Sequence, residues 1–246
     1  MAGKELVYGL HSVEALLTRC PERVKGLWVA KNARNNKVNQ VVTLAEQHEI
    51  AVNEVDREWL DKMTSGGNHQ GLLAQCGQRP LYSEADIPHL IETANGPPFI
   101  LILDQIEDPH NLGACLRVAD AAGVHFVIAP KHHSTHLTPT VIKVASGAAE
   151  TVPFIQVTNL SQLIRQLQQQ GIWVYGMAGE ATQSLYQTTL TGPLAIIMGA
   201  EGGGLRRLTR ECCDQLLYIP MLGTVSSLNV SVAAGVCLFE AVRQRQ

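Results

Sequence analysis

Apolar and polar positions along the first 76 residues follow a pattern that predicts a small α/β unit. Apolar residues at helical spacing predict helices over 11–20 and 36–48, and short apolar runs predict strands over 26–30, 50–55 and 71–76. Asp56 stands where a side chain would cap a further short helix over 57–63. We therefore expect an N-terminal domain over residues 1–76.

The composition changes between residues 77 and 98. Prolines and glycines interrupt this stretch, and only a weak helical pattern remains over 83–94. Segments rich in proline and glycine are typical of the linkers that join domains. We predict that residues 77–98 are a linker.

Beyond the linker, residues 99–246 alternate strands with helices. Apolar runs predict strands over 99–103, 125–129, 152–157, 172–177, 194–198 and 216–221, and helices are predicted over 111–123, 138–149, 161–170 and 230–242. Asn111 is placed to cap the first of these helices. Strands separated by helices of about ten residues indicate a mostly parallel sheet covered on both faces. The expected fold class is α/β.

Glycines and small polar residues gather at the ends of the last two predicted strands. Gly199, Gly202, Gly203 and Gly204 follow the strand over 194–198, and the small residues 224–229 lie between the next strand and the final helix. Glycines let a backbone approach a ligand closely. Because the carboxyl ends of parallel strands meet at one edge of a sheet, we expect a ligand cleft there.

Composition and charge narrow the class of protein. Apolar residues make up 46% and charged residues 17%, as in an ordinary globular protein, and the net charge is −3. No apolar run is long enough to span a membrane, and no secretory signal is present.

The six cysteines are scattered, which suits reduced thiols in the cytoplasm. His132, His133 and His136 lack a neighbouring carboxylate or cysteine, so we expect an exposed loop and no metal site.

Charge alone favours a metabolic enzyme over a nucleic-acid binder. One basic stretch, with Lys25, Lys31, Arg34 and Lys37, is compatible with an ordinary solvated face and with an edge that contacts phosphates. Common nucleotide motifs are absent: the glycines lie near the end of the chain with no acidic residue about 20 positions on, and no Gly-Lys-Ser/Thr follows them.

The predicted helix over 111–123 carries an arginine among apolar positions. Gly113 lies one turn before Arg117 on the same face and would leave room beside the guanidinium. The simpler interpretation is an ion pair between Arg117 and Asp120, three residues on. Both interpretations fit the residues.

Three segments together resemble the signature of the trefoil-knotted SPOUT methyltransferases, which methylate ribose 2′-hydroxyls in RNA. They are residues 108–117 (DPHNLGACLR), 198–202 (MGAEG) and 219–233 (IPM…SSLNVSVA). The resemblance extends over the second domain, and residues 8–13 with 69–74 are similar to the ribosomal-protein-like substrate-recognition domain of the same enzymes. It implies a knotted methyltransferase domain over 99–246 and a homodimer.

The resemblance also implies a cofactor and roles for particular residues. S-adenosyl-L-methionine would be held by Gly199, Ile219 and Leu228, and no metal would be needed because the sulfonium carries its own reactive methyl group. Arg117 would act on the ribose hydroxyl, with Asn111, Glu201, Ser227 and Asn229 arranging substrate and cofactor. A guanidinium is a poor base near neutral pH. Arg117 would therefore either be made more acidic by the sulfonium, or position a phosphate and stabilise the alkoxide.

Within the family, the likeness is to the bacterial enzymes that methylate a guanosine ribose in 23S ribosomal RNA, which implies that RNA as substrate. The separate N-terminal domain favours ribosomal RNA over transfer RNA. A tRNA 2′-O-ribose methyltransferase and a catalytically inactive ribosome-binding homologue are the alternatives. Arg206, Arg207 and Arg210 are candidates for phosphate contacts, although a charged helix face would contain the same residues.

Overall fold

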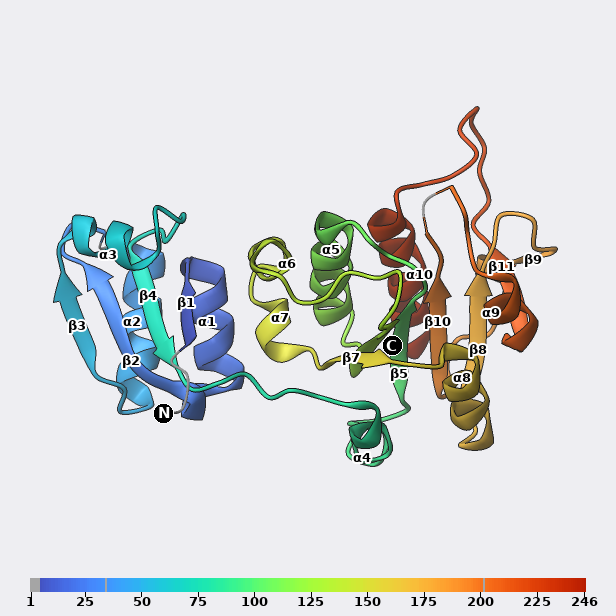
Figure 1. Cartoon of the computed structure of the whole chain (residues 1–246), viewed down its shortest axis with the longest axis horizontal. Helices are drawn as coiled ribbons and strands as arrows, with labels where there is room; N and C mark the ends of the chain where they lie inside the picture. Colours follow the sequence, from blue (N-terminus) through green and yellow to red (C-terminus); the bar gives the residue numbers. More distant parts are fainter. Residues whose placement is uncertain (1–4, 34, 201) are drawn as a thin grey trace. The chain divides into compact units, whose positions relative to one another are not determined.

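A computed structural model describes residues 5–33, 35–200 and 202–246. The chain forms two compact units (Figure 1). Residues up to Leu81 together with Ser146–Thr151 make the first unit, and Tyr82–Ala145 with Val152–Gln246 make the second. The short segment 146–151 therefore packs with the N-terminal residues, although it lies in the stretch where the sequence predicted a single second domain.

The first unit is built on a four-stranded sheet in the order β1-β4-β2-β3. Its strands are β1 (Glu5–Tyr8), β2 (Val24–Ala30), β3 (Val52–Val55) and β4 (Leu72–Cys76). β4 pairs antiparallel with β1 and β2, whereas β2 and β3 are parallel. Helices α1 (Leu10–Arg19) and α2 (Asn36–Gln47) share one buried cluster with the sheet, and α3 (Arg57–Met63) contributes Leu60 to another. The helices agree with prediction to within one residue, and β1 was not predicted.

Buried charges join distant parts of the first unit. Arg23, which follows α1 in a 3-10 turn (Pro21–Arg23), donates to Glu150 Oε2 at 3.0 Å and to Glu5 Oε2 at 3.2 Å. Arg79 pairs with the same two carboxylates. Glu150 lies in α7 (Ala148–Thr151), and its side chain is almost fully buried. Each buried charge is thus held by opposite charges, as burial requires.

The second unit contains a seven-stranded sheet in the order β7-β6-β5-β10-β8-β11-β9, within the described residues. The strands are β5 (Phe99–Leu103), β6 (Phe126–Pro130), β7 (Phe154–Val157), β8 (Trp173–Met177), β9 (Gln183–Ser184), β10 (Leu194–Met198) and β11 (Gln215–Tyr218). All of their pairings are parallel. The predicted α/β class is confirmed, and the knot implied by the resemblance stays a prediction.

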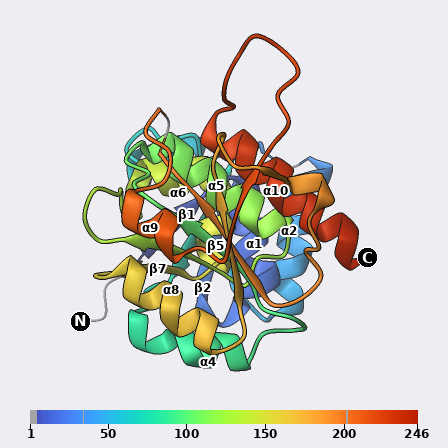
Figure 2. The same ribbon diagram turned by 90° about the vertical axis from the view of Figure 1, so that its right-hand side faces the viewer.

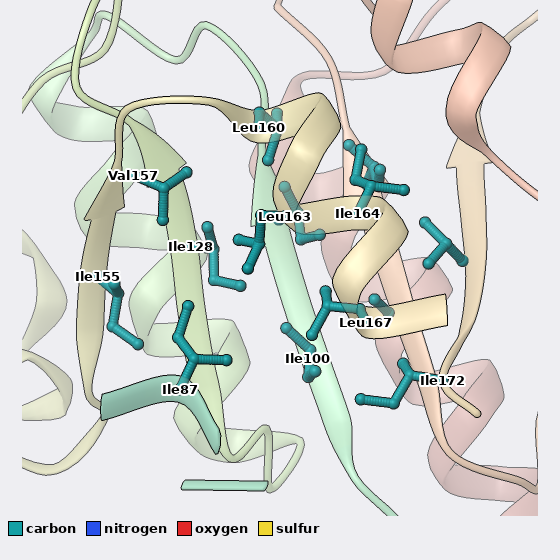
Figure 3. Close-up of a cluster of buried hydrophobic side chains, with 14 of the residues drawn as sticks. Ile87, Ile100, Ile128, Ile155, Val157, Leu160, Leu163, Ile164, Leu167 and Ile172 are labelled. Atoms are coloured by element: carbon teal, nitrogen blue, oxygen red, sulfur yellow. The ribbon is translucent and has the colours of Figure 1, made fainter. Parts of the chain in front are cut away.

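One face of this sheet is covered by α4 (Ile87–Glu92), α8 (Leu160–Gln169) and α9 (Arg207–Cys212) (Figure 3). Leu160, Leu163, Ile164 and Leu167 recur at helical spacing on α8 and are buried. They join Ile100, Ile128, Ile155 and Val157 in a single apolar cluster. The helical spacing of these four residues explains why this face of α8 packs on the sheet.

The opposite face carries α5 (Pro109–Ala121) and α10 (Val230–Arg245), which also pack on each other (Figure 2). Two predictions about α5 are wrong. Asp108, rather than Asn111, caps this helix, because its carboxylate accepts from His110 N at 2.9 Å. The space beside Gly113 is filled by α6 (Pro139–Ala145), since a Cβ there would lie 2.7 Å from Val144 Cβ.

The single helix predicted over 138–149 is also wrong. The structure has α6 and α7 separated at Ser146 and Gly147, whose φ angles are +50° and +96°. Such angles cannot continue a right-handed helix, and a Cβ at Gly147 would lie 2.8 Å from Ala15 Cβ. The close approach of α1 explains why glycine stands at this break.

Among the described residues, no helix is long and apolar enough to cross a membrane. Nor does the described part of the chain contain a group of three or more His, Cys, Asp or Glu side chains that could hold a metal ion.

Candidate active site

A cavity of about 560 Å³ lies at the carboxyl ends of β8, β10 and β11. Four segments line it: the end of β8 with the residues that follow it (Met177, Ala178, Gly179), the end of β10 with the glycine loop (Met198, Gly199, Ala200, Gly202, Gly204), the end of β11 and its loop (Leu217, Tyr218, Ile219, Met221), and the entry to α10 (Ser226, Ser227, Leu228, Val230, Ala233). The volume falls in the range of ordinary small-molecule sites. The predicted cleft at this edge of the sheet is therefore present.

The glycine loop has a defined backbone geometry. Ala200 and Gly204 form an antiparallel bridge, with N–O distances of 3.1 and 2.9 Å. Gly202 and Gly204 have φ angles of +77° and +62°, which favour glycine. A Cβ on Gly199 would lie only 2.2 Å from Gly204 C, so no other residue fits at position 199 without moving the loop.

The lining offers backbone and apolar surface. Cβ atoms built on Gly179, Gly202 and Gly204 would meet no atom within 4 Å, so these positions leave open space for a ligand against the main chain. Ile219 and Leu228 provide apolar contact, in keeping with a flat apolar ring packed between two loops.

The entry to α10 is tied to the entry to α5. Asn229 caps α10, and its Oδ1 accepts from Ser231 N at 3.0 Å and from Ser231 Oγ at 2.6 Å. Its Nδ2 donates to Asn111 Oδ1 at 2.9 Å. Two residues that are 118 positions apart are thus in direct contact.

A second cavity, of about 330 Å³, adjoins the first. It is lined by Gln105, Ile106, Glu107, Asp108, Asn111 and Ala200. Ala200 also lines the larger cavity, so the turn after Gly199 is a wall common to both. The smaller cavity is more polar, since it contains two carboxylates and the Asn111 amide.

The predicted site residues are only partly brought together. Gly199, Ile219, Leu228 and Ser227 line the larger cavity, Asn111 lines the smaller one, and Asn229 contacts Asn111. Arg117 is exposed on α5 and is not among the residues that line these two cavities within the described chain. Glu201 lies outside the described residues.

The sequence did not single out Met177, Ala178 and Gly179. They follow β8, which pairs with both β10 and β11. A glycine two residues after the end of an apolar strand was the available signal, but the sheet order that places this strand beside the glycine loop was not predicted.

The three arginines that follow the glycines each pair with a carboxylate: Arg206 with Asp104, Arg207 with Glu211 and Arg210 with Glu180. Only the exposed pair of Arg207 with Glu211, four residues on, is what the charged-face alternative expects, because Arg206 pairs with the fully buried Asp104 and Arg210 with a residue outside α9.

An α/β unit with a cavity of this size at the carboxyl edge of a parallel sheet, walled by a glycine loop, defines a class of proteins that bind small ligands at strand ends. The sequence profile described as SpoU rRNA Methylase family matches residues 98–239. A second profile, described as RNA 2′-O ribose methyltransferase substrate binding, matches residues 6–82. The chain belongs to the SpoU rRNA methylase family, which confirms the family indicated by the three segments.

Similar proteins and a similar solved structure each match nearly the full length of this chain. The 23S rRNA (guanosine-2′-O-)-methyltransferase RlmB of Pectobacterium atrosepticum is 54% identical over 98% of this chain and 98% of its own length. The protein of the same name from Escherichia coli strain K12 is 53% identical over 98% and 99%. The structure of an AdoMet-bound rRNA methyltransferase from Sinorhizobium meliloti, 25% identical, has a TM-score of 0.72 and covers 99% of this chain and 88% of that one.

Proposed function

We propose that this chain is a cytoplasmic enzyme that transfers a methyl group from S-adenosyl-L-methionine to the 2′-oxygen of a guanosine ribose in 23S ribosomal RNA. The observation that carries the proposal is the cavity formed by the loops after β8, β10 and β11, next to the Asn111–Asn229 contact. The two relatives named above act, by their names, on that RNA and that nucleoside, and each matches this chain over nearly its full length.

The residues of the larger cavity fit the cofactor. Gly199, Ile219 and Leu228 would hold it, with main-chain groups of the glycine loop facing the polar parts and the two apolar side chains enclosing the adenine. The bound cofactor supplies an electrophilic methyl group, so the protein has to align the ribose oxygen and assist removal of its proton.

The residues near the smaller cavity would carry out this second task. Asn111 and Asn229 hold the entries of α5 and α10 together, and Ser227 lies in the larger cavity wall beside them. In this proposal Glu201 and Arg117 are the remaining catalytic residues, and the guanidinium of Arg117 stabilises the charge that develops on the ribose oxygen.

A homodimer would explain how Arg117, which lines neither cavity of its own chain, takes part in the reaction. Val232, Val236 and Phe239 form an apolar stripe at helical spacing on α10, and Val232 and Phe239 are about half exposed. A second copy covering this stripe would meet the pair α5–α10, and would bring an Arg117 side chain near a cavity of its partner. The size of the purified protein in solution tests this part.

Methyl transfer to RNA from a strain that lacks this gene tests the proposed activity. Purified protein and labelled S-adenosylmethionine should label 23S rRNA, and nuclease mapping should find one 2′-O-methylguanosine. Labelling confined to transfer RNA would favour the tRNA alternative. Binding of ribosomal RNA without cofactor binding or labelling would favour the inactive homologue.

A further inference from the structure

The hydrogen bonds at the entry to α10 fix the direction of two side-chain amides. A backbone N–H can only donate, so the donation from Ser231 N identifies the atom of Asn229 that faces it as the oxygen. The amino group of Asn229 then faces Asn111, which must present its own oxygen there. As a consequence, Asn111 Nδ2 points away from Asn229.

The serine hydroxyl strengthens this arrangement. Ser231 Oγ lies 2.6 Å from the same Asn229 oxygen, so two donors of one residue hold it. Ser231 itself does not line either cavity described above. Its effect on a bound ligand would pass through Asn229 and Asn111.

The smaller cavity contains groups that suit a sugar hydroxyl. Asn111 lines it, and among the hydrogen bonds of the described residues none uses Asn111 Nδ2 as donor. Glu107 and Asp108 add carboxylate oxygens, which accept from hydroxyls and repel phosphate. A ribose hydroxyl both donates and accepts, so it complements an amide N–H together with a carboxylate.

We infer that the smaller cavity receives the ribose of the target nucleotide, that Asn111 Nδ2 donates to one of its oxygens, and that Ser231 is the positioning residue that fixes this direction through Asn229. The inference rests on the proposed function. It adds a subsite beside the shared wall at Ala200, and a role for a residue outside both cavities.

Two isosteric variants test the direction. In N111D one carboxylate oxygen still accepts from Asn229 Nδ2, but the outward amino group becomes an oxygen. In N229D the new carboxylate cannot donate, so Asn111 turns its amino group inward and its oxygen outward. Both variants should lower kcat/KM for 23S rRNA by about 10- to 100-fold, the effect of losing one buried hydrogen bond to substrate. The dissociation constant of S-adenosylhomocysteine should stay within about twofold of wild type, since neither residue lines the larger cavity.

Ser231 is tested by loss and rescue. S231A removes the hydroxyl donor to Asn229 Oδ1 and keeps the backbone donor of residue 231, so a smaller loss of kcat/KM for RNA is expected, again with unchanged cofactor binding. S231T keeps a hydroxyl and should restore the value. A merely structural role would lower the melting temperature and both affinities together. N159D is the matched control, because Asn159 caps α8 in the same way but lies outside the site.

The results separate this inference from the proposed function. If wild-type protein methylates 23S rRNA and N111D or N229D equals it in kcat/KM, the inference is overturned and the activity stands. If wild-type protein methylates no RNA, the proposed function fails. The affinity of each variant for 23S rRNA in the presence of S-adenosylhomocysteine then decides the inference alone: weakened binding supports it, and binding equal to wild type overturns it.

Discussion

Arg206 binds Asp104 with its side chain and its backbone at once. Asp104 directly follows β5 and is completely buried, and its carboxylate accepts from Arg206 Nε at 2.8 Å and from Arg206 N at 3.2 Å. Asp104 N also donates to Met198 O at 2.8 Å, at the end of β10. The residues on either side of the glycine loop, Met198 and Arg206, are therefore anchored to one residue beside the ligand cavity.

Removing the arginine should destabilise the protein and loosen the loop. R206A leaves the Asp104 carboxylate buried with only the backbone donor, and breaking a buried pair costs about 3–5 kcal/mol. Because the Arg206 side chain is 37% exposed, we expect about 2–3 kcal/mol in the free energy of unfolding, together with weaker cofactor binding. Urea unfolding and calorimetry measure the two effects. R207A is the control: its pair with Glu211 is exposed, and its effect should stay within about 0.5 kcal/mol.

Gly199 should tolerate no side chain. The Cβ of G199A would lie 2.2 Å from Gly204 C and 2.5 Å from Leu205 N, so the bridge between Ala200 and Gly204 must open. We expect loss of S-adenosylmethionine binding by calorimetry while the far-ultraviolet circular dichroism is retained. In the matched variant G203A the new Cβ meets nothing within 4 Å, and binding should persist. Equal binding by both variants would contradict the proposed cofactor site.

Two helical glycines should respond to alanine in opposite directions. In G113A the Cβ would lie 2.7 Å from Val144 Cβ and 2.8 Å from Val141 O, so α5 and α6 must separate, at a cost of about 1–3 kcal/mol. In G235A the nearest atom is Val118 Cγ1 at 3.7 Å, an ordinary contact. Alanine there should stabilise α10 by up to about 1 kcal/mol through helix propensity. Thermal unfolding of both variants decides the point, and a stabilised G113A would contradict the described packing.

Arg117 should matter for turnover and not for cofactor binding. Its side chain is exposed and lines neither cavity of its own chain. R117A should therefore bind S-adenosylmethionine as tightly as wild type. It should lose most methyl transfer, because in the proposed function the guanidinium stabilises the charge that develops on the ribose oxygen. R165A removes an exposed arginine from α8 and should leave turnover unchanged. Normal turnover of R117A would remove Arg117 from the mechanism.

Two buried thiols and one half-buried thiol should make stability fall at high pH. Burial raises the pKa of Cys76, Cys213 and Cys237 from the ordinary 9.0 to about 12. The unfolded chain loses these protons as the pH rises above 9, whereas the folded chain keeps them until about 12. The contribution is fully present below pH 9 and is lost between pH 9 and about 12.

Chemical denaturation as a function of pH measures this loss, and C76A should reduce its slope. A thiol reagent added to the native protein below pH 9 should modify these three cysteines far more slowly than in denaturant. Rapid modification of all three in the native state would contradict their burial.

Much of the fold follows from local patterns. The pattern over residues 161–170 predicted α8, and the apolar runs before Asp104 and Gly199 predicted β5 and β10. The glycine loop and the small residues before α10 marked the edge of the sheet where the cavity lies. These features can be predicted from the sequence because hydrophobic periodicity and backbone preference depend on residues that are close together in the chain.

The chain by itself thus determined which segments are strands and helices, which family they belong to and which loops reach the site. Only the tertiary structure decided the partners: Asn229 for Asn111, Arg206 for Asp104, and the segment with Glu150 for the N-terminal residues. The same holds for Gly113, whose missing side chain makes room for α6. The physical reason is that such contacts depend on the order of strands in the sheet, which brings together residues that no local pattern connects.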